Sequence, residues 1–318
     1  MVVADIAGPD DTSHLEPKAT PSMKQSSKRR PWTILGLVVV VALVGSCTAA
    51  CGSNSGRRPS RVARGDTATS VTTPSTTTST SSTSTTTTVV PSIPSGTPLT
   101  GKTVGIDPGH NGLNYTDPSY IDQQVWNGRE EEDCDTTGTE TDGGYTEALF
   151  NFSVAEYLSS DLQAEGAHVV MTRTTNSGVG PCVNERSEMI NAAGADVAID
   201  IHADGGPADG RGFTILEPVA DGPNDSVIAA SEAFGSDVLN RFGAVTGMPI
   251  SNYDGTDGIS FRDDLAGLNL TTVPKVLIEC GNMRNVTDAA LLVTSDFQRL
   301  AATAMAQAIT EFLVGPGG

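Results

Sequence analysis

The chain has 318 residues and divides into two parts of opposite charge. Residues 1–100 hold nine Lys and Arg against five Asp and Glu, whereas residues 101–318 hold ten against thirty-three, so the formal net charge changes from +4 to −23. An acidic domain is repelled by phosphate backbones and by anionic lipid head groups. This charge excludes nucleic-acid binding and leaves any membrane contact to the N-terminal part.

The N-terminal part contains a segment typical of an export signal. Four basic residues between positions 24 and 30 precede an uncharged, largely apolar run over residues 31–51. Within it, Val44-Gly-Ser-Cys47 resembles the lipobox of bacterial lipoproteins, which makes Cys47 the candidate for lipidation. The alternative is an uncleaved anchor, because the run is just long enough to cross a bilayer. Translation from Met23 instead of Met1 would give a signal of ordinary length.

A stretch rich in Thr, Ser and Pro follows the apolar run and has almost no residue able to enter a core. Such a composition predicts a disordered, extended tether, and it suits either O-glycosylation or a plain solvated spacer. We therefore divide the chain into a signal or anchor segment (1–52), a linker (53–100) and one folded domain (101–318). The protein is expected to be exported and held at the outer face of the plasma membrane by its N-terminus alone.

From Lys102 onward, strand and helix patterns alternate along the chain. Strands are predicted over 102–106, 168–171, 197–201, 212–216 and 275–279, and helices over 145–164, 183–193, about 226–243 and 288–312. This order predicts an α/β domain in which helices cover both faces of a mostly parallel, twisted sheet.

Four residues with the chemistry of a metal site lie where such a fold gathers its ligands. His110 follows the first strand, Glu147 begins a helix, and His202 and Glu279 end two later strands. In open α/β sheets ligands bind beyond the carboxyl ends of the strands. Two imidazoles and one carboxylate make a three-ligand zinc set that leaves a position for water, and a further carboxylate can move protons. The pattern predicts a metal-dependent hydrolase.

Several ordered motifs extend this set over residues 101–313. They are Val104-Gly-Ile-Asp-Pro-Gly-His110, Glu147 with the helix leading to His168-Val-Val-Met-Thr-Arg173, Asn184-Glu-Arg186, Ile201-His202-Ala-Asp204 and Val276-Leu-Ile-Glu279-Cys-Gly. With these motifs the chain resembles the zinc-dependent N-acetylmuramoyl-L-alanine amidases of the amidase-3 family, and most of all their small exported actinobacterial members. By this resemblance His110, Glu147 and His202 take the zinc-ligand positions and Glu279 that of the catalytic glutamate.

The resemblance implies peptidoglycan as the substrate and one Zn²⁺ per catalytic domain. The bond cut would be the amide between N-acetylmuramic acid and the L-Ala of the stem peptide. Glu279 would accept a proton from water and deliver it to the leaving nitrogen. Two other functions stay open, a zinc peptidase acting on stem peptides and a non-catalytic peptidoglycan-binding protein on the same scaffold. The acidic surface, with no coiled-coil pattern, favours a monomer.

Carboxylates next to the ligands are candidates for supporting roles. Asp200 replaces the small hydroxyl residue that the family commonly has two positions before the third ligand, and strand alternation puts it on the same side as His202. It either orients that imidazole or is a solvated or salt-bridged charge at a strand end. For Asp107 and Asp204 we expect turn or supporting roles, with direct zinc coordination as the alternative. Where the family often has an aromatic residue, this chain has Asn282-Met283, which leaves the shape of the groove open.

The cysteines and one long insertion complete the expectations. Cys134 and Cys182 lie in polar surroundings, and export favours a disulfide between them, whereas Cys280 lies in an apolar strand and should be buried. Residues 114–144 are acidic and long for a connection without structure. We hypothesise a flap that this disulfide pins beside the groove and that limits access, against the alternative of a solvated surface excursion. Arg173 and Arg186 are expected to stabilise loops or pair with acids.

Overall fold

A computed structural model describes residues 97–220 and 222–315. The expectations for the export segment, for Cys47 and for nearly all of the linker lie outside the described residues. Within these two ranges no helix combines the length and the apolar character that crossing a bilayer requires.

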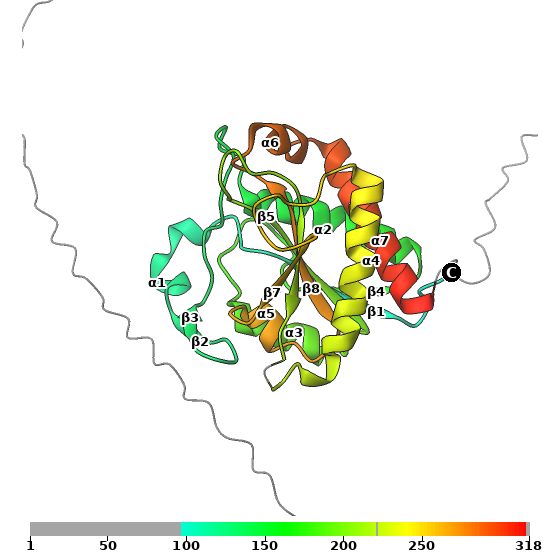
Figure 1. The fold of residues 1–318 in the computed structure, drawn as a ribbon. Helices are drawn as coiled ribbons and strands as arrows, with labels where there is room; N and C mark the ends of the chain where they lie inside the picture. Colours follow the sequence, from blue (N-terminus) through cyan, green and yellow to red (C-terminus); the bar gives the residue numbers. More distant parts are fainter. Residues whose placement is uncertain (1–96, 221, 316–318) are drawn as a thin grey trace, which may run out of the picture. The chain divides into compact units, whose positions relative to one another are not determined.

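A six-stranded, mostly parallel sheet forms the centre of the domain (Figure 1). Its strands run in the order β4-β1-β5-β8-β6-β7, and β6 is antiparallel to β8 whereas the other pairs are parallel. This architecture confirms the predicted fold class. The strands are β1 (Thr103–Pro108), β4 (His168–Met171), β5 (Val197–Asp204), β6 (Thr214–Pro218), β7 (Ile259–Arg262) and β8 (Lys275–Asn282).

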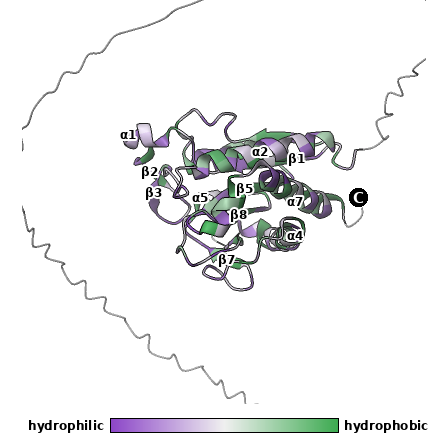
Figure 2. Cartoon of the chain, turned by 90° about the horizontal axis from the view of Figure 1, so that it is seen from above, coloured by the Kyte–Doolittle hydropathy of each residue, from purple (hydrophilic) through white to green (hydrophobic). Residues whose placement is uncertain are grey.

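Three long helices cover one face of the sheet. They are α2 (Glu147–Ala164), α4 (Ile228–Thr246), which follows the short turn η2 (Asp225–Val227), and α7 (Ser295–Val314). Alternate residues of β5, from Val197 to Ala203, join the main core beneath these helices because successive strand side chains point to opposite faces. Figure 2 shows this apolar character as green on the inner strands β5 and β8.

The opposite face carries the shorter helices α3 (Val183–Ala192) and α5 (Ala266–Asn269). Ile190 of α3 packs there on Ala198 of β5, and Leu268 of α5 packs on Leu277 of β8. The remaining β5 side chains on this face are Asp200, His202 and Asp204, toward the carboxyl end of the strand. Strand alternation therefore gives this face both its small apolar contacts and its polar residues.

The helix predicted over residues 288–312 is wrong in one respect, because the structure has two helices there. The first, α6 (Val286–Leu292), is capped by Asn285, and α7 begins after Thr294, whose hydroxyl accepts a hydrogen bond from the backbone N–H of Phe297 at 3.3 Å. A threonine cap satisfies a free N–H at a helix start and so favours a break at this residue. The sequence analysis also omitted the edge strand β7.

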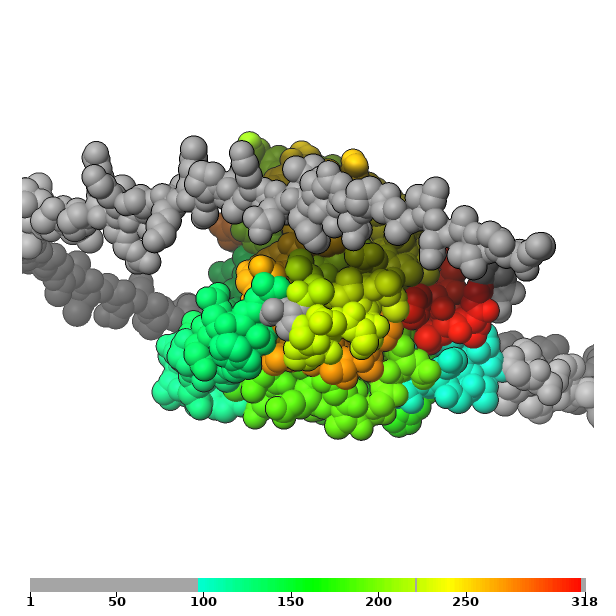
Figure 3. All heavy atoms as spheres, turned by 60° about the horizontal axis from the view of Figure 1, so that its bottom comes forward, coloured from blue at the N-terminus to red at the C-terminus, as the bar shows by residue number. Residues whose placement is uncertain are grey.

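The insertion over residues 114–144 has structure of its own. It contains η1 (Asn114–Thr116), α1 (Pro118–Ile121) and a hairpin of β2 (Gln124–Trp126) and β3 (Glu131–Asp133), and its teal and green atoms form a lobe at the left of Figure 3. A disulfide joins Cys134 to Cys182, the pairing predicted from the sequence, and so attaches the hairpin to the start of α3. Cys280 is buried in β8. The role of this segment in limiting access stays a prediction.

Candidate metal centre

The turn after β1 fixes the position of His110. A β-carbon on Gly109 would lie 2.1 Å from Cε1 of His202, so a glycine is needed for the turn to pass beneath that imidazole. His110 itself has φ 57°, a left-handed conformation that histidine adopts more readily than most residues. Arg173 and Arg186 hold the turn, since Nε of Arg173 donates to the carbonyl of Pro108 at 2.8 Å and Nη2 of Arg186 donates to that of His110 at 2.9 Å. The two arginines thus stabilise a loop, as predicted.

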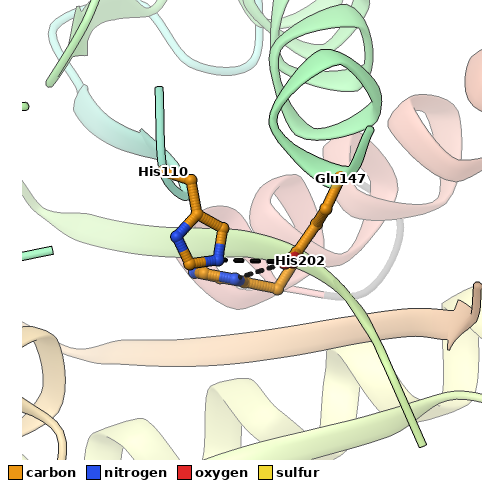
Figure 4. A group of neighbouring side chains, drawn as sticks. All are labelled: His110, Glu147 and His202. Atoms are coloured by element: carbon orange, nitrogen blue, oxygen red, sulfur yellow. Dashed lines mark hydrogen bonds and ion pairs between the residues drawn. The ribbon is translucent and has the colours of Figure 1, made fainter. Parts of the chain in front are cut away.

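Glu147 reaches both histidines from the first turn of α2 (Figure 4). Its Oε1 lies 2.8 Å from Nδ1 of His202 and its Oε2 lies 3.3 Å from Nε2 of His110. The backbone N–H of Thr139 donates to Oε2 at 2.9 Å. A carboxylate is favoured at this position because the N-terminus of a helix carries a partial positive charge.

These three side chains converge as the sequence analysis predicted. One donor atom from each of His110, Glu147 and His202 lies within 4.8 Å of the other two. The imidazole rings stand nearly perpendicular, with an interplanar angle of 88° and centroids 4.9 Å apart (Figure 4). Two imidazole nitrogens and one carboxylate oxygen are a donor set that zinc accepts in catalytic sites. The residues therefore fit this ion.

Burial and charge set the protonation of the three side chains. Burial disfavours the imidazolium of His110, but the Glu147 charge and the hydrogen bond with Asp135 raise the pKa of His110 to about 9. The pKa of His202 is likewise raised, against the effect of burial, by Asp200 and Glu147. Burial would raise the pKa of Glu147, but the two imidazoles hold it well below its usual range. The site strongly favours positive charge beside Glu147.

Glu279 lies on the strand next to His202. The two residues are paired in the parallel register of β5 and β8, so their side chains emerge side by side. Within the described residues, Oε2 of Glu279 is buried and has no hydrogen-bond partner. Burial, together with the charges of Glu147 and Asp204, raises the pKa of Glu279 to about 8 against the influence of His202. An uncompensated carboxylate here is poised to exchange protons.

The second nitrogen of each imidazole faces another carboxylate. Nδ1 of His110 lies 3.1 Å from Oδ1 of Asp135, and Nε2 of His202 lies 3.3 Å from Oδ1 of Asp200. Both alternatives considered for Asp200 thus describe real contacts, since its Oδ2 lies 3.5 Å from the ammonium of Lys275. Asp204 instead accepts a hydrogen bond from the hydroxyl of Tyr253.

Sequence reasoning missed Asp135 and Lys275 at this site. Asp135 directly follows Cys134, so the predicted disulfide already placed it near the start of α3. Lys275 and Glu279 are four residues apart in β8, so their side chains point to the same face of the sheet. Asp107, named only as a flanking residue, contacts Lys275 and Arg186 in the interior.

A cavity of about 220 Å³ adjoins the two histidines on the α3 and α5 side of the sheet. Its wall combines Asp135, Asp200 and Glu132 with the apolar side chains of Leu265 and Leu277. The hairpin contributes to this wall, and Glu132 accepts a hydrogen bond from the backbone N–H of Ala266 at 3.2 Å. The insertion therefore contacts α5 beside the site.

Comparison with known proteins decides the family. The family model described as N-acetylmuramoyl-L-alanine amidase matches residues 104–311, which include every residue of the centre. The chain belongs to the N-acetylmuramoyl-L-alanine amidase family. As a member of this amidase family it is a hydrolase that cuts peptidoglycan at the amide bond between N-acetylmuramic acid and L-alanine, and zinc dependence is a general property of the family.

Relatives of this amidase cover most of its length. It is 37% identical over 226 residues to the N-acetylmuramoyl-L-alanine amidase Rv3717 of Mycobacterium tuberculosis, a match that spans 70% of this chain and 92% of that protein. The solved amidase Ami1 of Mycobacterium smegmatis matches with a TM-score of 0.64 and 37% identity over 68% of this chain and 98% of the other. The apo form of Ami1 from Mycobacterium abscessus also gives 0.64, with 38% identity over 68% of this chain and 100% of the other. The match to solved amidases thus extends over the catalytic domain.

Proposed function

We propose that His110, Glu147 and His202 hold one catalytic zinc ion and that Glu279 is the proton carrier of the amidase reaction. The observation that carries this proposal is the convergence of three donor atoms within 4.8 Å beside an unpartnered buried carboxylate. Bound zinc supplies a water of pKa about 7 and polarises the substrate carbonyl. The protein's own side chains must then move the protons.

Glu279 has the position and the environment for that task. Its pKa of about 8 applies to the site without a cation, and a divalent cation nearby favours the ionised carboxylate. In the ionised form Glu279 can accept a proton from water and then protonate the leaving nitrogen of L-Ala. The same carboxylate therefore serves both halves of the hydrolysis.

Product analysis tests the bond that is cut. We expect the purified protein to release intact stem peptides with a free L-Ala amino group from muropeptides. Treatment with a chelator should abolish this release, and added Zn²⁺ should restore it. Fragments of the stem peptide would identify a zinc peptidase instead, and binding of peptidoglycan without any release would identify a non-catalytic protein.

The location of the enzyme is a second part of the proposal. The basic and apolar pattern of residues 24–51 supports export, and a peptidoglycan substrate lies outside the plasma membrane. We infer anchoring through lipidated Cys47 or an uncleaved helix, with a monomeric catalytic domain. Metabolic labelling with a fatty-acid analogue separates the two anchors, because only a lipid-anchored wild type incorporates the label and Cys47→Ser should then lose it.

A further inference from the structure

The two histidines of the candidate centre are each supported by a buried ion pair. Oδ1 of Asp135 contacts Nδ1 of His110, and its Oδ2 lies 3.1 Å from Nη2 of Arg186. The side chains of Asp135 and Arg186 are both 3% exposed. The orientation of the His110 imidazole is therefore coupled to a cation that water does not reach.

A looser set of contacts lies on the His202 side, at ion-pair distances, and within the described residues Oδ1 of Asp200 is buried without a hydrogen bond. Oδ1 of Asp200 lies 3.3 Å from its Nε2, and Oδ2 of the same aspartate lies 3.5 Å from the ammonium of Lys275. The side chain of Lys275 is 1% exposed. Helix α5 comes close to this pair at Gly267, where a β-carbon would lie 3.1 Å from Oδ2 of Asp200 and 3.2 Å from Nζ of Lys275.

A single carboxylate joins the two supports. Oδ1 of Asp107 accepts a hydrogen bond from Nη1 of Arg186 at 3.1 Å, and Oδ2 accepts one from Nζ of Lys275 at 2.8 Å. The hydroxyl of Thr172 also donates to Oδ1 at 2.7 Å. Asp107 thus contacts both cations, and through them both carboxylates that face the histidines.

The sheet register explains why these groups meet. Asp107 of β1 is paired with Asp200 of β5, and Lys275 of β8 is paired with Ala198, two residues before Asp200 on the same face. The long side chain of Lys275 extends from there toward the carboxyl ends of the strands. Three neighbouring strands therefore present one connected set of charges beneath the histidines.

A contribution to folding stability does not by itself explain why these buried charged side chains lie together. Removing two cations and three carboxylates from water is costly, and well-packed apolar residues often stabilise a core as well or better. Fixed orientation of the imidazoles, in contrast, needs charged partners that are themselves held in place. The geometry favours a function in the site over a function in the core.

We propose that Asp107, Arg186 and Lys275 form a positioning unit that orients both metal-binding histidines, with Asp107 as the shared member. This inference rests on the proposed zinc site. It assigns the unit no contact with substrate. Its effect is on how tightly, and in which geometry, His110 and His202 bind the ion.

Metal affinity of the full chain tests the unit. Asp107→Asn keeps the size of the side chain and removes its charge, and we expect its Zn²⁺ affinity, measured by competition with a chromogenic chelator, to fall about 10-fold to 100-fold. The absorption spectrum of the Co²⁺-substituted protein should change as well, because the ligand geometry changes. Asp200→Asn should lower the affinity by a similar factor, and the double variant should lose less than the product of the two losses.

Asp288→Asn is the matched control. Asp288 is 0% exposed and pairs with Arg211 at 2.9 Å, and within the described residues it contacts neither histidine. Its replacement should lower the melting temperature and leave the Zn²⁺ affinity unchanged.

Two outcomes separate the possible failures. If the wild type binds Zn²⁺ and a folded Asp107→Asn binds it equally well, the positioning unit is overturned and the zinc site stands. If Asp107→Asn does not fold, Asp200→Asn alone decides by the same measurement. A wild type that binds no Zn²⁺ overturns the proposed site itself.

Discussion

His202 and Glu279 are direct neighbours in the register of β5 and β8, so one backbone pairing places the third candidate ligand beside the candidate proton carrier. Both side chains emerge on the sheet face that α3 and α5 cover only in part. The rigidity of a central strand pair fixes their separation better than two loops would. This pairing would link the proposed metal chemistry to the proposed proton transfer of the amidase.

The pairing predicts different losses for the two residues. Glu279→Gln removes the proposed proton carrier, so we expect kcat on muropeptides to fall about 10²-fold to 10⁴-fold while the protein keeps its zinc. His202→Ala removes a ligand and should lose both zinc and activity. Metal content by atomic absorption, measured on the same samples as the kinetics, distinguishes the two. If Glu279→Gln also lost its zinc, Glu279 would be needed to hold the ion, and its assignment as a proton carrier without a ligand role would be wrong.

The backbone over the site gives a second prediction. A β-carbon on Gly138 would lie 2.7 Å from Oε2 of Glu147 and 2.7 Å from Cδ2 of His110. Gly138→Ala should therefore displace two ligands and lower the Zn²⁺ affinity at least about 10-fold, in addition to a strain of about 1–2 kcal/mol from its φ of +69°.

Gly144→Ala supplies the control for this substitution. Gly144 has a similar φ of +79°, but a β-carbon there would meet nothing within 4 Å. It should lose the same stability in a urea titration and keep the wild-type affinity. Equal affinities of the two variants would show that Gly138 does not need to be small.

The strand ends explain how much of this site could be predicted from the sequence. His110 follows β1, whereas His202 and Glu279 lie in the second halves of β5 and β8, and parallel strands bring their carboxyl ends to one edge of the sheet. Glu147 could be chosen because it combines the start of a predicted helix with the spacing of the family motif. The alternation of strand and helix patterns in the sequence predicts these positions, and it also predicts the sheet and its long helices.

Other features depend on contacts that no periodicity records. Asp135 approaches His110 through an irregular insertion, and the partner of a buried Lys275 cannot be inferred from an apolar strand. The break between α6 and α7 falls at Thr294 inside a continuous helical pattern, and only its capping hydrogen bond marks it. These are tertiary effects that override local propensity.

The disulfide that holds the insertion predicts a loss of stability. It closes a loop of sequence separation 48, so replacing both Cys134 and Cys182 by Ser should lower the free energy of unfolding by about 4 kcal/mol in the chain-entropy treatment. Because Asp135 follows Cys134 directly, the Zn²⁺ affinity should fall too. Urea titration and chelator competition measure the two effects. Dithiothreitol should lower the free energy of unfolding of the wild type and leave that of the double variant unchanged. A double variant as stable as the wild type would contradict the prediction.

Glu217 on β6 predicts a pH dependence that is independent of the metal site. Its side chain is buried against Gly235 of α4, and burial, with the charge of Glu232, raises its pKa from 4.5 to about 7. Between about pH 4.5 and pH 7 the folded protein therefore holds a proton that the unfolded chain has released. The contribution of Glu217 to the free energy of unfolding should fall by about 1–2 kcal/mol as the pH rises through this window, after solvent screening is allowed for, and should level off above it.

Glu217→Gln should remove this contribution. At pH 8 the variant should be more stable than the wild type in a urea titration, and at pH 4.5 the two should agree, since both side chains are then neutral when folded. Glu156→Gln, at an exposed position of α2, serves as the control and should follow the wild type at both pH values. A Glu217→Gln variant with the same pH profile as the wild type would show that this carboxyl is solvated in the folded protein, and the slope would then have to come from Glu279 and the imidazoles, whose pKa values are also raised.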